Sequence, residues 1–141
     1  MIRTIVFSNV ILAAMALPVL AQEEQVVDCA NATTQSDLNI CAYRDYQAAD
    51  GALNTAYRKA LAAAQETDRQ IGEYDEKAVG AVDALKKAQR AWIPYRDGQC
   101  ALAGFAARGG SMEPMLVSGC LAELTAKRTE ELKATVENLG N

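Results

Sequence analysis

The chain of 141 residues contains no histidine. Histidine is the commonest general base and the usual imidazole ligand of metals, so a Ser-His mechanism and a His-held metal centre are excluded. Aromatic residues make up only 6% of the chain and there are three prolines, whereas half of the residues are apolar and alanine dominates that half. This composition favours a single helical domain.

Basic residues are in the minority, with 14 Lys and Arg against 18 Asp and Glu and a formal charge of −4. A nucleic-acid surface needs clustered Lys and Arg that displace counterions, so this balance argues against a nucleic-acid partner. The chain also shows no recognisable catalytic motif. We therefore expect a protein that acts by binding and not by catalysis, without a cofactor or a bound metal.

Residues 1–21 are typical of a cleaved secretory signal peptide. Arg3 supplies the positive charge, residues 5–17 are mostly apolar, and small or tolerated residues precede Gln22. An uncleaved membrane anchor is the alternative, but the apolar stretch is short for a spanning helix. Cleavage removes only one charged residue, Arg3, which leaves a formal charge of −5. We expect an exported protein, periplasmic or secreted, without stable membrane insertion after cleavage.

Four cysteines fall within the part of the chain that remains, at Cys29, Cys41, Cys100 and Cys120. An even number of cysteines in an exported chain predicts disulfides. The absence of a CxxC motif argues against a zinc site or a dithiol redox centre. Two disulfides and no free thiol are therefore expected, and all three possible pairings stay open at this point.

The first helix is predicted at residues 35–67, after a polar lead-in at 22–33. Thr34 and Asp37 form a start signal in which the Thr34 hydroxyl accepts a hydrogen bond from the backbone three residues on. Gly72 is expected to separate this helix from the next. Apolar residues recur along it at helical steps, at Leu38, Ala42, Tyr46, Ala49, Leu53, Tyr57, Ala60 and Ala64.

The second helix is predicted to begin at Glu73, Asp75 and Glu76, because acidic residues in a first turn oppose the positive end of the helix dipole. Pro94 lies inside this helix and lacks an N–H, so we expect a kink near Arg90 and not a split.

The third helix is predicted to start around Ser111, Glu113 and Pro114 and to run to Leu139. Short connections make consecutive helices antiparallel, so the expected fold is all-α, an up-down-up three-helix bundle over residues 34–139.

Counting along this bundle at about 1.5 Å per residue places Cys41, Cys100 and Cys120 in one layer at one end, with Cys29 within reach of it. The four sulfurs should therefore cluster, although the count cannot choose their pairing. The same count puts Asp50, Trp92 and Arg128 in a deeper layer, which suggests an Asp50–Arg128 ion pair beside the indole.

Four blocks in this order resemble the LprI-like lysozyme inhibitor family over about residues 28–133. The blocks are Cys29 with Thr34-Gln35-Ser36-Asp37-Leu38-Asn39-Ile40-Cys41; Ala49-Asp50-x-x-Leu53-Asn54-x-x-Tyr57; Leu85-x-x-x-Gln89-x-x-Trp92-x-x-x-Arg96-Asp97-x-x-Cys100; and Cys120-x-x-x-x-Thr125-x-x-Arg128-x-x-x-Leu132. The resemblance implies an exported helical domain with disulfides, and a protein partner for which lysozyme is the candidate. The lipid-attachment cysteine of a lysozyme-inhibiting member has no counterpart after the signal peptide, so membrane tethering does not carry over.

The connection at residues 104–114 is the best candidate for contact with a partner. It combines an aromatic anchor at Phe105, a cation at Arg108 that can meet acidic groups, and the flexible glycines at 109 and 110, which Ser111 and Met112 follow. The competing interpretation is an ordinary interhelical loop with Phe105 tucked against the bundle.

Three other groups have structural explanations that we favour. Glu73, Asp75 and Glu76 could bind a cation but also suit a helix start. Trp92, Arg96 and Asp97 could form a binding patch, although a core indole with charges at the bundle edge is the commoner arrangement, and we expect Asp50 and Arg128 to be structural as well. Tyr43, Tyr46 and Tyr57 could stack on sugars, although one helix face docking into a core also explains their spacing.

The leading hypothesis is inhibition of lysozyme or a related peptidoglycan-cleaving enzyme, and the alternative is a non-catalytic envelope interaction or scaffolding module.

Overall fold

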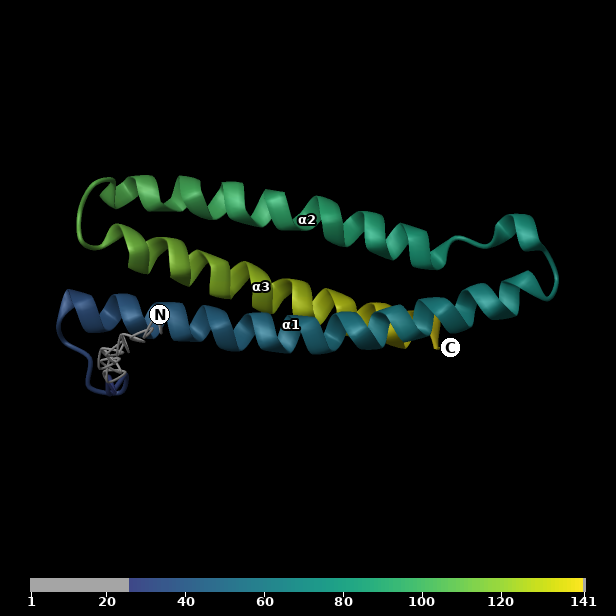
Figure 1. Ribbon diagram of the computed structural model, residues 1–141, viewed down its shortest axis with the longest axis horizontal. Helices are drawn as coiled ribbons and strands as arrows, with labels where there is room; N and C mark the ends of the chain where they lie inside the picture. The colour runs from purple at the N-terminus through teal and green to yellow at the C-terminus, as the bar shows by residue number, and fades with distance from the viewer. Residues whose placement is uncertain (1–25, 141) are drawn as a thin grey trace, which may run out of the picture.

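The computed structural model describes residues 26–140, and this part of the chain consists of helices and connections without strands. The three long helices are α1 (Gln35–Gly72), α2 (Ala81–Gly104) and α3 (Glu113–Leu139). Two short 3-10 helices, η1 (Glu76–Ala78) and η2 (Phe105–Ala107), lie in the connections. The helices alternate in direction along the long axis of the molecule (Figure 1), which confirms the predicted all-α, up-down-up bundle. The predicted signal peptide lies outside the described residues.

The beginning of α1 follows the predicted capping pattern. The Thr34 hydroxyl accepts a hydrogen bond from the Asp37 backbone N–H at 3.1 Å and donates one to the Asp37 carboxylate at 2.7 Å. The helix ends at Gly72 and is longer than the predicted 35–67. In its last turns Arg69 pairs with Glu66 and Glu73, and the hydrogen bond from Arg69 lowers the pKa of Glu66 to about 2.

The predicted start of the second helix is wrong. Asp75 and Glu76 belong to η1 and its cap, and α2 begins later, at Ala81. Gly80 at the N-cap has no side chain to offer, and the cap comes instead from Asp68 on α1. The Asp68 carboxylate accepts hydrogen bonds from the backbone N–H groups of Gly80, Ala81 and Val82 at 2.7–3.0 Å. Helix α2 therefore begins where the neighbouring helix supplies an acceptor for its unpaired N–H groups.

Helix α2 continues through Pro94. The helix is therefore not split at the proline, and Figure 1 shows a gentle change of direction along it. Pro94 is exposed, which places the lost hydrogen bond to the Arg90 carbonyl where water can replace it.

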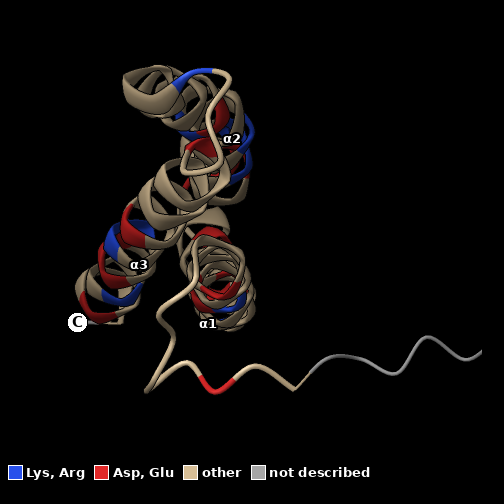
Figure 2. Ribbon diagram, turned by 90° about the vertical axis from the view of Figure 1, so that its left-hand side faces the viewer, with Lys and Arg blue, Asp and Glu red and all other residues tan. Residues whose placement is uncertain are grey.

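The apolar core lies between α1 and α3 and under the first half of α2. Ala56, Ala60 and Ala64 recur every four residues along α1 and are almost completely buried, because their small side chains let α3 approach closely. The remaining buried members of the core are Leu53, Leu85 and Leu132. Helix α3 packs far more extensively on α1 than either helix packs on α2, and Figure 2 shows α2 as a separate upper layer.

Candidate functional site

Both disulfides lie at the end of the bundle where α1 begins. Cys29–Cys41 ties the segment before α1 to its second turn, and Cys100–Cys120 joins the last turns of α2 to the first turns of α3. The predicted clustering at one end is confirmed, and the structure selects the pairing that the sequence left open. No described cysteine is free. The loop between α2 and α3 is therefore anchored covalently just outside both of its ends.

Arg96 lies at the centre of this end of the bundle and is only 7% exposed. Its guanidinium lies against two aromatic rings, 5.1 Å from the centroid of Trp92 and 5.4 Å from that of Tyr46. Trp92 lies one turn earlier on α2, whereas Tyr46 comes from α1. Stacking on aromatic faces suits a guanidinium because the ion is planar and weakly hydrated.

The polar partners of Arg96 come from all three helices. Nε donates to Oδ1 of Asp97 on α2 at 2.9 Å, and Nη2 forms an ion pair with the same oxygen at 2.8 Å. Nη1 donates to the Thr125 hydroxyl on α3 at 3.4 Å and lies 3.7 Å from the Asp50 carboxylate on α1. This arrangement satisfies a buried charge that would otherwise be costly, and it closes the bundle beneath the disulfides.

The suggested Asp50–Arg128 ion pair is wrong. Asp50 faces Arg96, while Arg128 on α3 pairs with Glu131 at 2.8 Å and donates to Gln89 on α2 at 3.2 Å. Counting along the helices predicts the height of each residue in the bundle, but it does not give the direction in which each side chain leaves its helix. Asp50 and Arg128 both face α2, and each finds its own partner there.

The α2–α3 loop presents Phe105 and Met112 to solvent. Phe105 is 58% exposed and Met112 is 42% exposed, so Phe105 does not tuck against the bundle. The Arg108 guanidinium lies over the Phe105 ring, 4.7 Å from its centroid, and pairs with the Glu113 carboxylate at 2.6 Å. The aromatic ring and the cation that the sequence pointed out are thus adjacent and held in place.

The backbone of this loop is fixed by further contacts. Gly109 adopts a positive φ of 77° and donates its N–H to Glu113 at 2.8 Å, which is the main cause of a lowered pKa for that carboxyl. The Ser111 carbonyl accepts a hydrogen bond from Asn39 on α1 at 3.0 Å. At Gly104 a Cβ would lie 2.6 Å from Val117, so only glycine allows α2 to turn so close to α3. The result is a short, rigid tip with an exposed apolar anchor.

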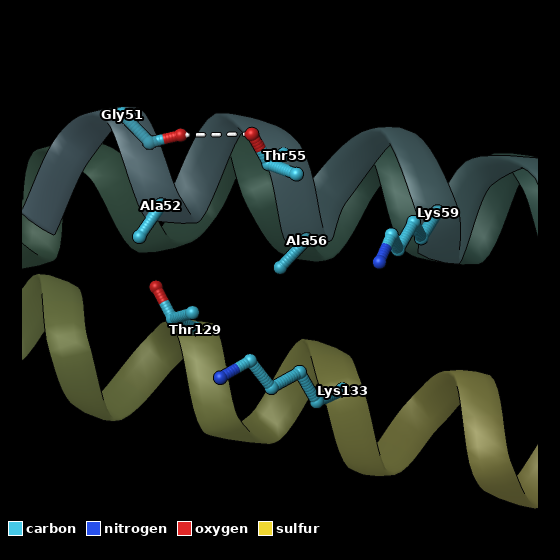
Figure 3. Close-up of a pocket in the computed structure, with 7 residues that line it drawn as sticks. All are labelled: Gly51, Ala52, Thr55, Ala56, Lys59, Thr129 and Lys133. Carbon is cyan, nitrogen blue, oxygen red and sulfur yellow. Dashed lines mark hydrogen bonds between the residues drawn. The ribbon is translucent and has the colours of Figure 1, made fainter.

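A second feature is a hollow of about 440 Å³ between α1 and α3, shown in Figure 3. Lys59 and Lys133 extend along it from opposite walls, over small side chains of α1. The hydroxyls that line it are already used, since Thr55 donates to the Gly51 carbonyl and Thr129 to that of Thr125. Lys133 also pairs with Glu130. The hollow therefore offers a ligand few unused polar groups, and the loop is the better-built contact site.

Comparison with known proteins places these features in one family. Residues 28–132 match the family described as lysozyme inhibitor LprI. The chain belongs to the LprI family. It is 60% identical to the uncharacterized protein R02472 of Rhizobium meliloti (strain 1021), over 93% of this chain and 94% of that protein. It is 31% identical to the uncharacterized protein YecT of Escherichia coli (strain K12), over 55% of this chain and 49% of that protein. No solved structure matches.

The sequence did not reveal several partners that shape this end of the LprI domain. In the sequence Tyr46 is one of a row of tyrosines, whereas in the structure it forms one wall around Arg96. Glu113 suits a helix start, but it also holds both Arg108 and Gly109. In each case the sequence showed a charged or aromatic residue close to one of the family blocks. Its contact partner could not be identified, because that partner lies on another helix or across a turn.

Proposed function

We propose that this protein is an exported inhibitor of lysozyme or of a related peptidoglycan-cleaving enzyme, and that it acts in the periplasm or outside the cell. Family membership over residues 28–132 is the observation that carries the proposal. The two disulfides agree with an oxidising compartment. No helix among the described residues is long and apolar enough to cross a membrane.

The proposed contact is the α2–α3 loop, through Phe105, Arg108, Ser111 and Met112. Blocking an enzyme cleft requires an element that projects, keeps its shape and carries an apolar anchor, because ordering a flexible loop on binding would cost affinity. Phe105 and Met112 supply exposed apolar surface, while Cys100–Cys120 and Glu113 keep the loop in shape. The exposed Arg108 guanidinium lies beside the anchor, where it can meet carboxylates of an acidic cleft.

Charge supports a basic partner such as an animal c-type lysozyme. The first turns of α1 carry the carboxylates of Asp37 and Asp45, of which Asp45 is exposed, whereas Asp97 at the end of α2 is paired with Arg96. An acidic end of this kind steers a basic protein towards the loop and raises the association rate more than the final affinity. The attraction should weaken as salt is added.

The test is a lysozyme activity assay with the purified, oxidised protein, and the key variant is Phe105→Ala. We expect this variant to raise the inhibition constant by about tenfold or more, as for an exposed aromatic anchor. Tyr74→Ala is the matched control, because Tyr74 is 90% exposed at the opposite end of the bundle. An unaltered inhibition constant for Phe105→Ala would remove the loop from the contact. Absence of inhibition of both c-type and g-type lysozymes by the unmodified protein would leave the scaffolding alternative.

A further inference from the structure

Helix α2 carries an exposed face without a charged residue. The residues of this face recur at alternating steps of four and three, and they are Ala84, Ala88, Ala91, Tyr95, Gly98 and Leu102. All six are exposed, although Ala84 and Ala88 also line a hollow that α2 shares with α3. Alternating steps of three and four average 3.5 residues, which is the period with which one helix packs along another in a coiled coil. We call these six residues the α2 seam.

Packing within the monomer does not explain the second half of the α2 seam. Tyr95 is 60% exposed and Leu102 is 62% exposed. Gly98 lies inside the helix, where glycine is less favourable than alanine, and a Cβ built on it would meet nothing within 4 Å. The close approach of another helix backbone would account for a glycine at this position and for the two large apolar residues beside it.

The sizes of the side chains point to one particular partner. The three alanines occupy the first half of the seam, and Tyr95 and Leu102 lie in the second half. If a second α2 helix lies antiparallel about a two-fold axis, Leu102 faces Ala84 of the other copy and Tyr95 faces its Ala91. Gly98 then faces Ala88. Every large side chain meets a small one, whereas a parallel pair would put Tyr95 on Tyr95 and alanine on alanine.

We propose that the α2 seam is the interface of an antiparallel homodimer. A two-fold interface must be complementary to itself. The α2 seam meets that condition because one half carries small side chains and the other half carries the two large ones. Helix α2 stands as the upper layer of the bundle (Figure 2), which leaves its exposed side open to a second copy. A contact over about 20 helical residues with two large side chains from each copy buries on the order of 1,000 Å² in total, enough for a weak and reversible dimer.

The first experiment is sedimentation analysis of the oxidised protein, without residues 1–21, across a wide concentration series. The unmodified protein should pass from monomer to dimer as its concentration rises. Leu102→Glu buries a charge in the proposed interface and should raise the dimer dissociation constant at least about tenfold. Ala101→Glu is the matched control, because it adds the same charge one residue earlier on the exposed surface of α2 but outside the seam. It should leave dimerisation nearly unchanged.

The second experiment tests the register. Ala84→Glu and Leu102→Lys should each weaken the dimer alone. An equimolar mixture should associate more strongly than either variant, because the antiparallel arrangement brings the carboxylate introduced at position 84 of one variant against the ammonium group introduced at position 102 of the other. A parallel dimer would place these two positions at opposite ends of the interface, and mixing would then restore nothing.

Three results would overturn the proposal. These are a monomer at every concentration, equal effects of Leu102→Glu and Ala101→Glu, and a mixture that associates no better than its components. A monomer in which Leu102→Glu weakens lysozyme inhibition would assign the seam to the enzyme and not to a second copy. The homodimer does not depend on lysozyme binding, since sedimentation is measured without the enzyme.

Discussion

Arg96 joins three helices through contacts that an apolar side chain of the same size would not make. Its guanidinium lies between Trp92 and Tyr46, and its N–H groups reach Asp97 and Thr125. The bundle interior is polar here, because two polar residues, Arg96 and Thr125, are buried side by side. Arg96 therefore stabilises a part of the bundle that the apolar core does not reach.

Replacing Arg96 should destabilise the protein even though no ligand contact is lost. We expect Arg96→Met to lower the free energy of unfolding by about 2 kcal/mol, because Asp97 and Thr125 lose a charged hydrogen-bond partner. Urea unfolding followed by circular dichroism measures the loss. Arg90→Met is the control, since Arg90 is an exposed arginine on the same helix. Equal losses for the two variants would contradict a structural role for Arg96.

At the scale of the elements, the start of α2 depends on a residue of α1. Three consecutive backbone N–H groups of α2 donate to the Asp68 carboxylate, and these hydrogen bonds lower the pKa of Asp68. The ionised carboxylate also opposes the positive end of the helix dipole. One side chain thus fixes both the first residue of α2 and the position of that end of α2 on α1.

Acid should weaken this cap in a predictable direction. Because the pKa of Asp68 is lower in the folded protein than in the unfolded chain, its stabilising effect is fully present above the ordinary aspartate pKa and is lost as the pH falls through the lowered value. Asp68→Asn should lower the melting temperature by several degrees at neutral pH, and the difference from the unmodified protein should shrink in acid. Thermal melts at a series of pH values test this. Asp45→Asn, on an exposed part of α1, should show no such cap effect, and a constant difference for Asp68→Asn would refute the proposed linkage.

The whole molecule is held together by different means at its two ends. The alanine-rich core binds α1 to α3, whereas the disulfide end relies on two covalent links and the Arg96 cluster. Helix α2 packs least extensively of the three. The Cys100–Cys120 link therefore matters most for keeping α2 and the loop after it on the bundle.

Removing one disulfide at a time should show this division. In the chain-entropy model, loops closed over 12 and 20 residues each contribute about 3 kcal/mol, so both double variants to alanine should lose a similar free energy of unfolding. Hydrogen exchange should separate them. Cys100→Ala with Cys120→Ala should lose amide protection in the last turns of α2 and in the 105–112 loop. Cys29→Ala with Cys41→Ala should keep that protection, and loss of it there would contradict the assigned roles.

Local patterns in the sequence predicted the helices well where the deciding residues are neighbours. Thr34 and Asp37 mark the start of α1, and Pro114 marks the start of α3, because caps and first turns involve residues a few positions apart. The same logic failed at Glu73, Asp75 and Glu76. These acids suit a helix start, but the acceptor that α2 uses is Asp68, which lies on the preceding helix.

The candidate loop is recognisable from composition, since Phe105 and Arg108 stand out between glycines. Its geometry was not predictable, because Arg108 lies over the Phe105 ring and at the same time pairs with Glu113 on α3. The suggested ion pair of Asp50 with Arg128 failed for a related reason. The rise per residue of a helix gives height along the bundle, but the rotation of each helix about its own axis depends on how it packs.

The order of residues along the chain is enough to specify the helical class, the alternating direction of the helices and the end at which the cysteines gather, because hydrophobic period, turn residues and helix length act locally or add along one axis. Helix packing selects which cysteines pair, which residue caps α2 and which side chains surround Arg96. Each of these choices joins residues of different elements. They are settled only when the helices pack and each buried charge, sulfur and backbone N–H must find a partner within reach.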